Sequence, residues 1–449
     1  MTSTVTAVPA AEERRGPDGA SRPASLWGNR DFLKFWSGET LSLFGTQVTT
    51  LAIPLTAVLV FKATPAQVGL LRFLQLVPYL GLAMVFGVWV DRGRRKPVMM
   101  LANGARMVLI ASIPVLSATH RLTLGLLLGI ACAVGVFSVL FDVSWMAFVP
   151  TLVKEPEHYV EANQKLGVTS SSADVAGPGV AGAVISALSA PTALALDGVS
   201  YLISLLTLLW IRTPEPRPAA PAQQAERHLT AELRQGLRFV FGDRILRPLA
   251  LIAPFCNFSM VGVWTMFLLY ATRGAGLSPA QVGIVFAASS VGGLIGAALS
   301  RRLIARFRLG ALYAVSMIAV FVAPLLIPLA SGPRPVLLTA FIASFFLAYL
   351  GLGVANVVVI SLRQASTPQP LMGRMNAAFR TVLFGGGALG GLAGGLIAGA
   401  MGPRAGLAAV ATGSALMVLP VLLSPVTRLP AMPGMPAMPA MPADPEGRE

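Results

Sequence analysis

The residues of this chain that could do chemistry are carboxylates placed within apolar sequence. No Asp or Glu occurs between Arg244 and Ala443, and the three histidines lie outside the apolar stretches. A group that binds and releases protons near neutral pH must be of one of these kinds. If protons drive the activity, a carboxylate of the first half must therefore carry them, and the candidates are Glu39, Asp91, Asp142, Asp174 and Asp197.

Two of these carboxylates are preferred as proton carriers. Asp174 lies midway along an apolar stretch with no obvious cation nearby, although Ser171 or Ser172 could simply hold it by a hydrogen bond. Glu39 lies near the start of another stretch, where it could carry protons, bind a cationic substrate or pair with Lys34. An unpaired charge at the centre of a bilayer costs roughly 2.5–3.5 kcal/mol, so we expect each carboxylate to face a cavity or a partner.

The other charges within apolar stretches are expected to have structural partners. Asp197 is expected to make a hydrogen bond between helices, with Arg72 as a further partner. Arg106 is expected to pair with Asp142.

These residues are held in place by apolar stretches that are long enough to cross a bilayer. The chain is 55% hydrophobic and 12% charged, whereas soluble proteins carry about 25% charged residues. Stretches of about 20 residues, the length of a membrane-spanning helix, recur from Leu41 to Ser424. We count twelve, which predicts an all-α polytopic membrane protein, because lipid-exposed strands would leave backbone groups unpaired.

Basic residues lie overwhelmingly on one side of the predicted helices. Of the 34 Lys and Arg residues, 27 fall on the side of the termini, five on the other side and two within helices. This asymmetry predicts that both termini are cytoplasmic. It also indicates that the net charge of +15 orients the helices and contacts anionic lipid headgroups, and that it does not serve to bind nucleic acid. Arginine outnumbers lysine 29 to 5 among abundant Ala, Gly and Pro, which indicates a high-GC bacterium. We expect the protein to lie in the plasma (inner) membrane of that bacterium.

The sequence Pro-Ala-Gln-Val-Gly occurs twice, at residues 65–69 and 279–283, and each copy opens an apolar stretch that ends in arginines. This repeat predicts two six-helix halves related by an axis along the membrane normal. The expected domains are a disordered tail (1–30), the first half (31–212), a linker with an amphipathic helix (213–246), the second half (247–428) and a Pro/Met-rich tail (429–449).

The loop that begins at Gly87 resembles the signature loop of the major facilitator superfamily, Gly-x-x-x-Asp-Arg-x-Gly-Arg-Arg/Lys. Asp91, Arg92, Arg95 and Lys96 match it, whereas Arg94 stands in place of the second glycine. The resemblance covers residues 30–425 and extends to the third drug:proton antiporter family of macrolide and siderophore exporters. It implies a conformational latch between this loop and the eleventh crossing, with Arg95 bridging to Asp142. A solvated, positively charged turn is the alternative.

A glycine-rich stretch in the fifth crossing resembles the antiporter motif Gly-x-x-x-Gly-Pro-x-x-Gly-Gly. Gly177, Pro178 and Gly182 match, whereas Ala181 replaces a glycine. Small residues let helices approach closely, so we expect a sealing contact between the halves, with the glycines of residues 385–399 as the partner surface. Ordinary tight packing is the alternative. The arginine usual in the family's fourth crossing is absent from residues 129–141.

The resemblance implies a secondary active transporter that works as a monomer by alternating access. The leading hypothesis is proton-driven export of amphipathic small molecules, such as an antibiotic, a drug or a siderophore. A lipid flippase, a metabolite importer and a non-transporting receptor are the alternatives. Crossings one and seven usually line the cavity in the superfamily. The residues of these crossings that we expect to line the cavity here are Phe44, Gln47, Phe255, Asn257, Phe258, Trp264 and Phe267.

Enzymatic motifs are missing from the sequence. It contains no Gly-x-Ser-x-Gly, no His-Glu-x-x-His and no P-loop lysine motif, which argues against an enzyme and against an ATP-driven pump. We expect no cofactor and no metal site. The methionines of the C-terminal tail at spacing three could bind Cu(I), but a low-complexity tail is the preferred interpretation.

Overall fold

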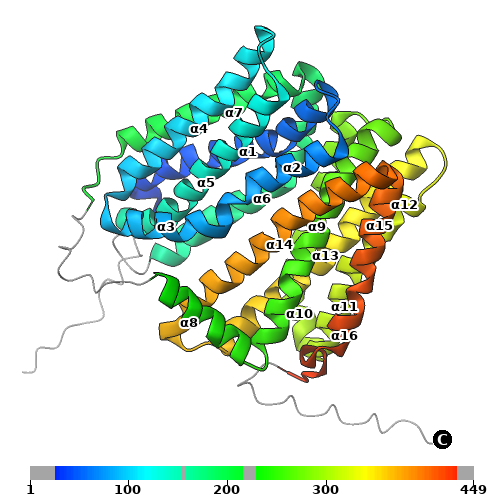
Figure 1. Cartoon of the computed structure of the whole chain (residues 1–449). Coiled ribbons are helices and arrows are strands. Elements are labelled where there is room, and N and C mark those ends of the chain that lie inside the picture. Colours follow the sequence, from blue (N-terminus) through cyan, green and yellow to red (C-terminus); the bar gives the residue numbers. More distant parts are fainter. Residues whose placement is uncertain (1–25, 154–157, 216–228, 432–449) are drawn as a thin grey trace, which may run out of the picture.

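The computed structural model describes residues 26–153, 158–215 and 229–431, and within these ranges it contains no strand (Figure 1). The two expected tails lie almost entirely outside the described residues. The helices of the first half are α1 (Arg30–Leu59), α2 (Pro65–Leu76), α3 (Pro78–Arg92), α4 (Arg95–Ala118), α5 (Leu124–Leu152), α6 (His158–Leu188) and α7 (Ala190–Trp210).

The linker contributes α8 (Leu229–Gly242), which occupies the segment expected to be an amphipathic helix. The helices of the second half are α9 (Leu246–Leu269), α10 (Pro279–Arg306), α11 (Leu309–Val322), α12 (Leu326–Leu329), α13 (Arg334–Ala365), α14 (Met372–Met401), α15 (Pro403–Leu416) and α16 (Val418–Leu423). Short turns of helix complete the chain at Leu26–Gly28, Tyr270–Gly274, Ala323–Leu325, Gln369–Leu371 and Pro425–Arg428.

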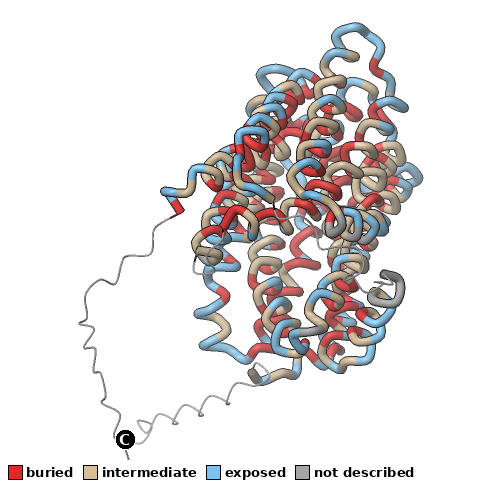
Figure 2. The backbone as a smooth tube through the Cα atoms, turned by 90° about the vertical axis from the view of Figure 1, so that its left-hand side faces the viewer, coloured by how far each residue is buried: buried red, intermediate tan, exposed pale blue. Residues whose placement is uncertain are grey.

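Eleven of the described helical segments are long and apolar enough to cross a membrane. The expected fifth crossing, α6, is not among them, because it carries Glu161, Lys165 and Asp174 together with several serines. It is nevertheless 31 residues long and packs between α1 and α10. Exposed residues run along the full length of the helices (Figure 2), and they include large apolar side chains such as Val108, Val115 and Val315. Such apolar surface is stable against lipid, so the predicted polytopic membrane fold is confirmed.

Figure 1 shows α1–α7 gathered in one bundle and α9–α16 in a second bundle beside it. The main contacts between the two bundles are those of α2 with α14 and of α6 with α10. We call the end of the molecule at which α1 begins and α16 ends the terminal face, and the other end the opposite face.

The repeated pentapeptide begins α2 and α10 in the same way. Pro65 and Pro279 occupy the first turn of their helices, where a missing N–H group costs nothing. Thr64 and Ser278 each accept a hydrogen bond from the backbone N–H three residues later, and the glutamine at that position bonds back to the cap. The repeat is therefore a helix start that closes with a capping box.

The glycine that ends each pentapeptide lies at a contact between the bundles. A Cβ atom on Gly69 would lie 2.8 Å from the Cα of Gly395, and one on Gly283 would lie 2.9 Å from the Cα of Gly182. The backbones of α2 and α14, and of α6 and α10, therefore touch directly near the opposite face. We call these two contacts the glycine seal.

Candidate functional site

Two adjoining cavities lie between the bundles. The first has a volume of about 610 Å³ and is lined from α1, α6, α9, α10 and α13. The second has a volume of about 480 Å³ and is lined mainly from α9, α13 and α14. Both cavities share the side chains of Trp264, Tyr349, Leu352 and Asn356, so they form one continuous region beneath the glycine seal.

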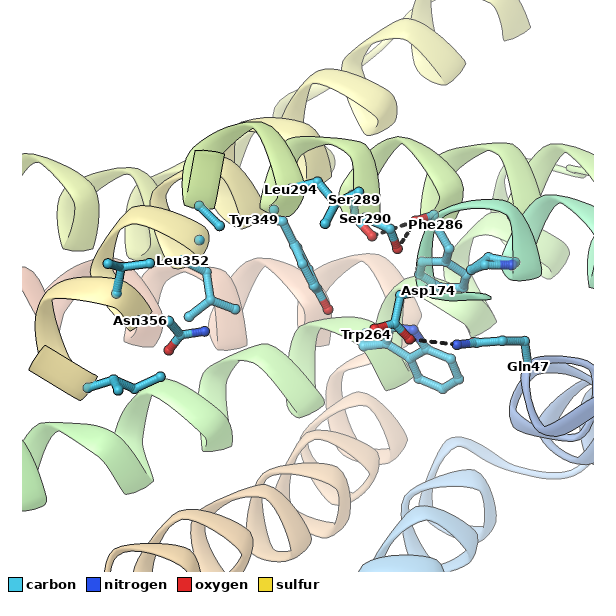
Figure 3. Close-up of a pocket in the computed structure, with 16 residues that line it drawn as sticks. Gln47, Asp174, Trp264, Phe286, Ser289, Ser290, Leu294, Tyr349, Leu352 and Asn356 are labelled. Carbon is cyan, nitrogen blue, oxygen red and sulfur yellow. Dashed lines mark hydrogen bonds between the residues drawn. The ribbon is translucent and has the colours of Figure 1, made fainter. Parts of the chain in front are cut away.

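Asp174 lies in the wall of the first cavity, exposed to its interior (Figure 3). Its Oδ1 accepts a hydrogen bond of 2.8 Å from Nε2 of Gln47, so α1 and α6 meet through this pair. The alternative that a neighbouring serine holds Asp174 is wrong, since Ser172 donates to the carbonyl of Val168 and Gln47 occupies the carboxylate.

Three of the seven residues nominated for the cavity lie in the walls of the two cavities described here. Gln47, Asn257 and Trp264 line the cavities. Phe267 does not, because it is fully buried and packs edge-on against Phe286, Phe341 and Phe345.

The other predicted aromatic residues do not line the two cavities either. Phe255 is 52% exposed on another face of α9, and Phe44 and Phe258 lie outside the lining. Tyr349 and Asn356, which do line both cavities, were missed because they lie on α13. An asparagine in the apolar sequence of α13 was the signal that could have indicated a cavity-facing position.

Glu39 lies in a buried polar cluster within the first bundle. It is 7% exposed, and its Oε2 has no hydrogen-bond partner among the described residues. Arg106 lies nearby with its guanidinium over the rings of Phe141 and Tyr201, at 4.2 and 4.5 Å, and it donates to Asn103. The alternative that Glu39 pairs with Lys34 is wrong, because Lys34 binds Asp31 at 2.8 Å.

Asp142 faces the second bundle through a tyrosine. Its Oδ2 accepts a hydrogen bond of 2.9 Å from the hydroxyl of Tyr79, and the Tyr79 ring stacks on Phe384 of α14 at 4.8 Å. The expected ion pair with Arg106 is not formed at ion-pair distance among the described residues. Tyr79 thus joins α3, α5 and α14, a role that the sequence did not reveal.

The predicted latch loop is engaged with the linker in this conformation. The backbone N–H groups of Arg95 and Lys96, at the start of α4, donate to the two carboxylate oxygens of Glu215 at 2.5 and 3.2 Å. The expected bridge from Arg95 to Asp142 is not formed here, because the Asp142 carboxylate is held by Tyr79. A Cβ atom on Gly87 would meet nothing within 4 Å. The side chains of Asp91 and Arg92 lie outside the described residues.

Asp197 makes the structural bonds expected of it. It is fully buried and accepts hydrogen bonds from Thr49 of α1 and Ser200 of its own helix. The expected pair with Arg72 is wrong. Arg72 instead lies over the ring of Trp264 at 4.7 Å and donates to Gln75 at 3.1 Å.

The glycine motif of α6 contacts three different neighbours. Gly177 packs on the Gln47 side chain, Pro178 lines the first cavity, and Gly182 forms the glycine seal with α10. Ala181 is fully buried in the core. The expectation that the glycines of α14 are the partner surface of this motif is wrong, because they pack on α9 and α2 instead.

The family model described as Major Facilitator Superfamily matches residues 35–391 of the chain. The chain is 27% identical over 351 residues to the enterobactin exporter EntS of Escherichia coli O1:K1 / APEC, which covers 77% of this chain and 79% of that protein. It is 28% identical to the EntS of Escherichia coli O81 (strain ED1a) over the same shares.

Solved structures share the fold at low sequence identity. The nucleoside transporter NupG superposes with a TM-score of 0.68 at 12% identity, covering 88% of this chain and 99% of that one. A bacterial homologue of the lysosomal transporter Spinster, in an inward-facing and unoccupied conformation, has a TM-score of 0.66 at 16% identity, covering 89% and 96%. Both are similar to this chain in the arrangement of their helices.

Proposed function

This chain belongs to the Major Facilitator Superfamily and is a multi-pass secondary transporter of small molecules, and from that premise we propose that it exports amphipathic small molecules in exchange for protons. The substrates that we propose are of the siderophore, antibiotic or drug kind. The observation that carries the export direction is the similarity over 77% of the chain to enterobactin exporters. That similarity also favours export over the importer, flippase and receptor alternatives.

The position of the cavities supports alternating access. They lie between the two bundles, and the glycine seal closes the region toward the opposite face. The 27-to-5 distribution of basic residues supports an orientation in which the terminal face lies on the cytoplasmic side of a bacterial inner membrane. In this conformation a substrate would therefore enter from the cytoplasm, and a rocking of the two halves would release it outside.

The geometry of Asp174 supports its role as the proton carrier. It is the carboxylate in the cavity wall, where water and substrate have access, and Gln47 holds it against α1. Protonation would remove the charge that orients the Gln47 amide, and a substrate entering the cavity would compete for the same groups. Glu39, buried beside Arg106, is the second candidate, because its unpartnered oxygen can accept a proton.

The latch that we propose uses Asp142 and the loop around residues 87–96. Asp142 reaches α14 through Tyr79 and Phe384, while Glu215 of the linker holds the start of α4. Closure of the terminal face would exchange the Glu215 contact for one with the start of α14.

The test of the proposed function is transport by the full chain in proteoliposomes and in an efflux-deficient bacterial host. We expect host cells that produce the protein to accumulate less of at least one amphipathic compound from a broad panel. The same compound, added outside proteoliposomes with an acidic interior, should cause protons to leave them as the compound enters. Unchanged accumulation across the panel together with no substrate-dependent proton flux would contradict the proposal.

A further inference from the structure

Three arginines line the second cavity, and none of them forms an ion pair with a carboxylate of the described residues. They are Arg72 of α2, Arg363 of α13 and Arg380 of α14. Among the described residues no carboxylate oxygen lies within 4.0 Å of any of these guanidinium groups. The second bundle cannot supply one, because the sequence has no Asp or Glu between Arg244 and Ala443.

Arg72 lies at the deep end of this cavity. It is the eighth residue of α2, close to the glycine seal, and its Cβ and Cγ lie 3.0 Å from where a Cβ on Gly391 would be. Its guanidinium lies over Trp264, and its Nε is buried without a hydrogen-bond partner. The positive-inside rule does not account for this cation, because Arg72 is near the face opposite the basic loops.

Arg363 and Arg380 lie toward the terminal face, each beside an aromatic ring. The guanidinium of Arg363 is 4.2 Å from the ring centre of Phe379 and donates to Asn376. That of Arg380 is exposed to the cavity and lies 5.8 Å from the ring centre of Phe384. Phe379 lines the cavity too, so Arg363 presents cationic and aromatic surface together, and Arg380 adds a second charge.

The nearest acidic groups belong to the other wall. Asp142 interacts electrostatically with Arg380, but its carboxylate is bonded to Tyr79. Asp174 lies in the first cavity, bonded to Gln47. The region between the bundles is thus divided into an acidic wall in the first half and a cationic, aromatic wall formed by Arg72 and the second half.

We propose that the second cavity is an anion site for an aromatic substrate with two or more carboxylate, sulfonate or phenolate groups. Burial of an unpaired guanidinium is costly, and a bound anion would supply the missing partner of Arg72. Arg380 precedes Gly391, the neighbour of Arg72, by 11 residues, which is about 16 Å along a helix. An elongated anion can therefore contact both ends of the cavity. This inference rests on the proposed function, whose substrate class it narrows.

The test compares two dyes that share a xanthene ring and differ in charge, the dianion fluorescein and the cation rhodamine 123. Binding to the full chain in nanodiscs is measured by fluorescence anisotropy. We expect fluorescein to bind at least about tenfold more tightly, which corresponds to about 1.4 kcal/mol. Arg72→Gln and the double variant Arg363→Gln/Arg380→Gln should each remove most of this preference, whereas Arg72→Lys should retain part of it.

Arg302→Gln is the matched control. It removes the same charge from an exposed position on α10 that does not line either cavity, so fluorescein binding should not change. A preference for rhodamine 123, binding of neither dye, or equal losses in the control and cavity variants would overturn the anion site. Thermal unfolding of each variant separates loss of binding from loss of folding.

The same dyes separate the anion site from the exporter. Proton-driven transport of rhodamine 123 without a fluorescein preference would overturn the anion site and leave the exporter standing. Arginine-dependent binding of fluorescein, with no proton-driven transport of any compound of the panel, would leave the anion site standing and contradict the exporter.

Discussion

Asp174 and Glu39 are carboxylates of the same bundle with different surroundings. Asp174 is exposed to the first cavity, and among the described residues its hydrogen-bond partner is Gln47. Glu39 is buried, and one of its oxygens has no partner among the described residues. A proton that couples to substrate must be exchanged where substrate and water both reach, so the geometry ranks Asp174 ahead of Glu39.

At this scale we predict that Asp174→Asn uncouples the transporter. The amide keeps the shape of the carboxyl group and can still bond to Gln47, but it cannot carry a proton. Uphill, proton-driven uptake into inverted vesicles should fall by at least about tenfold, while downhill exchange of substrate continues. The ratio of uphill to downhill transport therefore falls in Asp174→Asn, and Glu39→Gln should lower this ratio by less.

Asp243→Asn is the control for this substitution. Asp243 lies outside the cavities and caps α9 through the N–H groups of Ile245 and Leu246, a role that asparagine fills equally well. Its uphill transport should match that of the wild type. Full coupling in both Asp174→Asn and Glu39→Gln would show that neither carboxylate carries the proton.

At the scale of elements, the two copies of the pentapeptide have the same role in the two contacts that form the glycine seal. Each copy starts a helix with a capping box and then places a glycine against a glycine of the other bundle. Gly182 and Gly395, the partners, occupy equivalent places in α6 and α14. The pseudo-symmetry of the sequence therefore appears in the structure as two equivalent contacts between the bundles.

We predict that Gly182→Ala and Gly395→Ala each weaken the glycine seal. The new methyl group would lie 2.6 Å from the backbone oxygen of Pro279 or of Pro65, so the helices must separate. Transport should fall, and a cysteine placed at the seal should react faster with a membrane-impermeant maleimide added from outside. Gly129→Ala is the control, because its methyl group would meet nothing within 4 Å. Equal behaviour of all three variants would contradict the role of the seal.

At the scale of the whole molecule, contacts between the bundles are concentrated near the opposite face. Ala280 donates to Ser186, and Arg273 donates to the carbonyl of Val58, both beside the glycine seal. Toward the terminal face, α14 contacts the first bundle at Tyr79 and Met146. Two rigid halves that touch at one end can rock about the cavities between them.

This arrangement predicts opposite changes of two distances. Spin labels at Gln164 and Arg301, both exposed near the terminal face, should move together as the transporter turns outward. Labels at Leu188 and Met401, both exposed near the opposite face, should move apart at the same time. Pulsed electron paramagnetic resonance with and without a transported compound measures both pairs. Changes of the same sign would exclude rigid rocking.

The sequence by itself determined the membrane fold, the two halves and the set of acidic residues. Apolar length, the pentapeptide repeat and a count of carboxylates are local or compositional properties, so they can be read without coordinates. It also placed Gln47, Asn257 and Trp264 at the cavity, through residue type and the family resemblance. The sequence did not show which face of each helix packs against which neighbouring helix.

Only the tertiary structure determined which residues are the partners of the charged and polar side chains. The azimuth of each helix is set by packing between residues far apart in sequence, and this buried Phe267, brought Gln47 to Asp174 and placed Tyr79 between Asp142 and α14. The same packing turned Arg72 away from Asp197 and toward Trp264. The sequence shows that a charged residue within a membrane-spanning segment needs a partner, but the three-dimensional arrangement of the helices determines which residue that partner is.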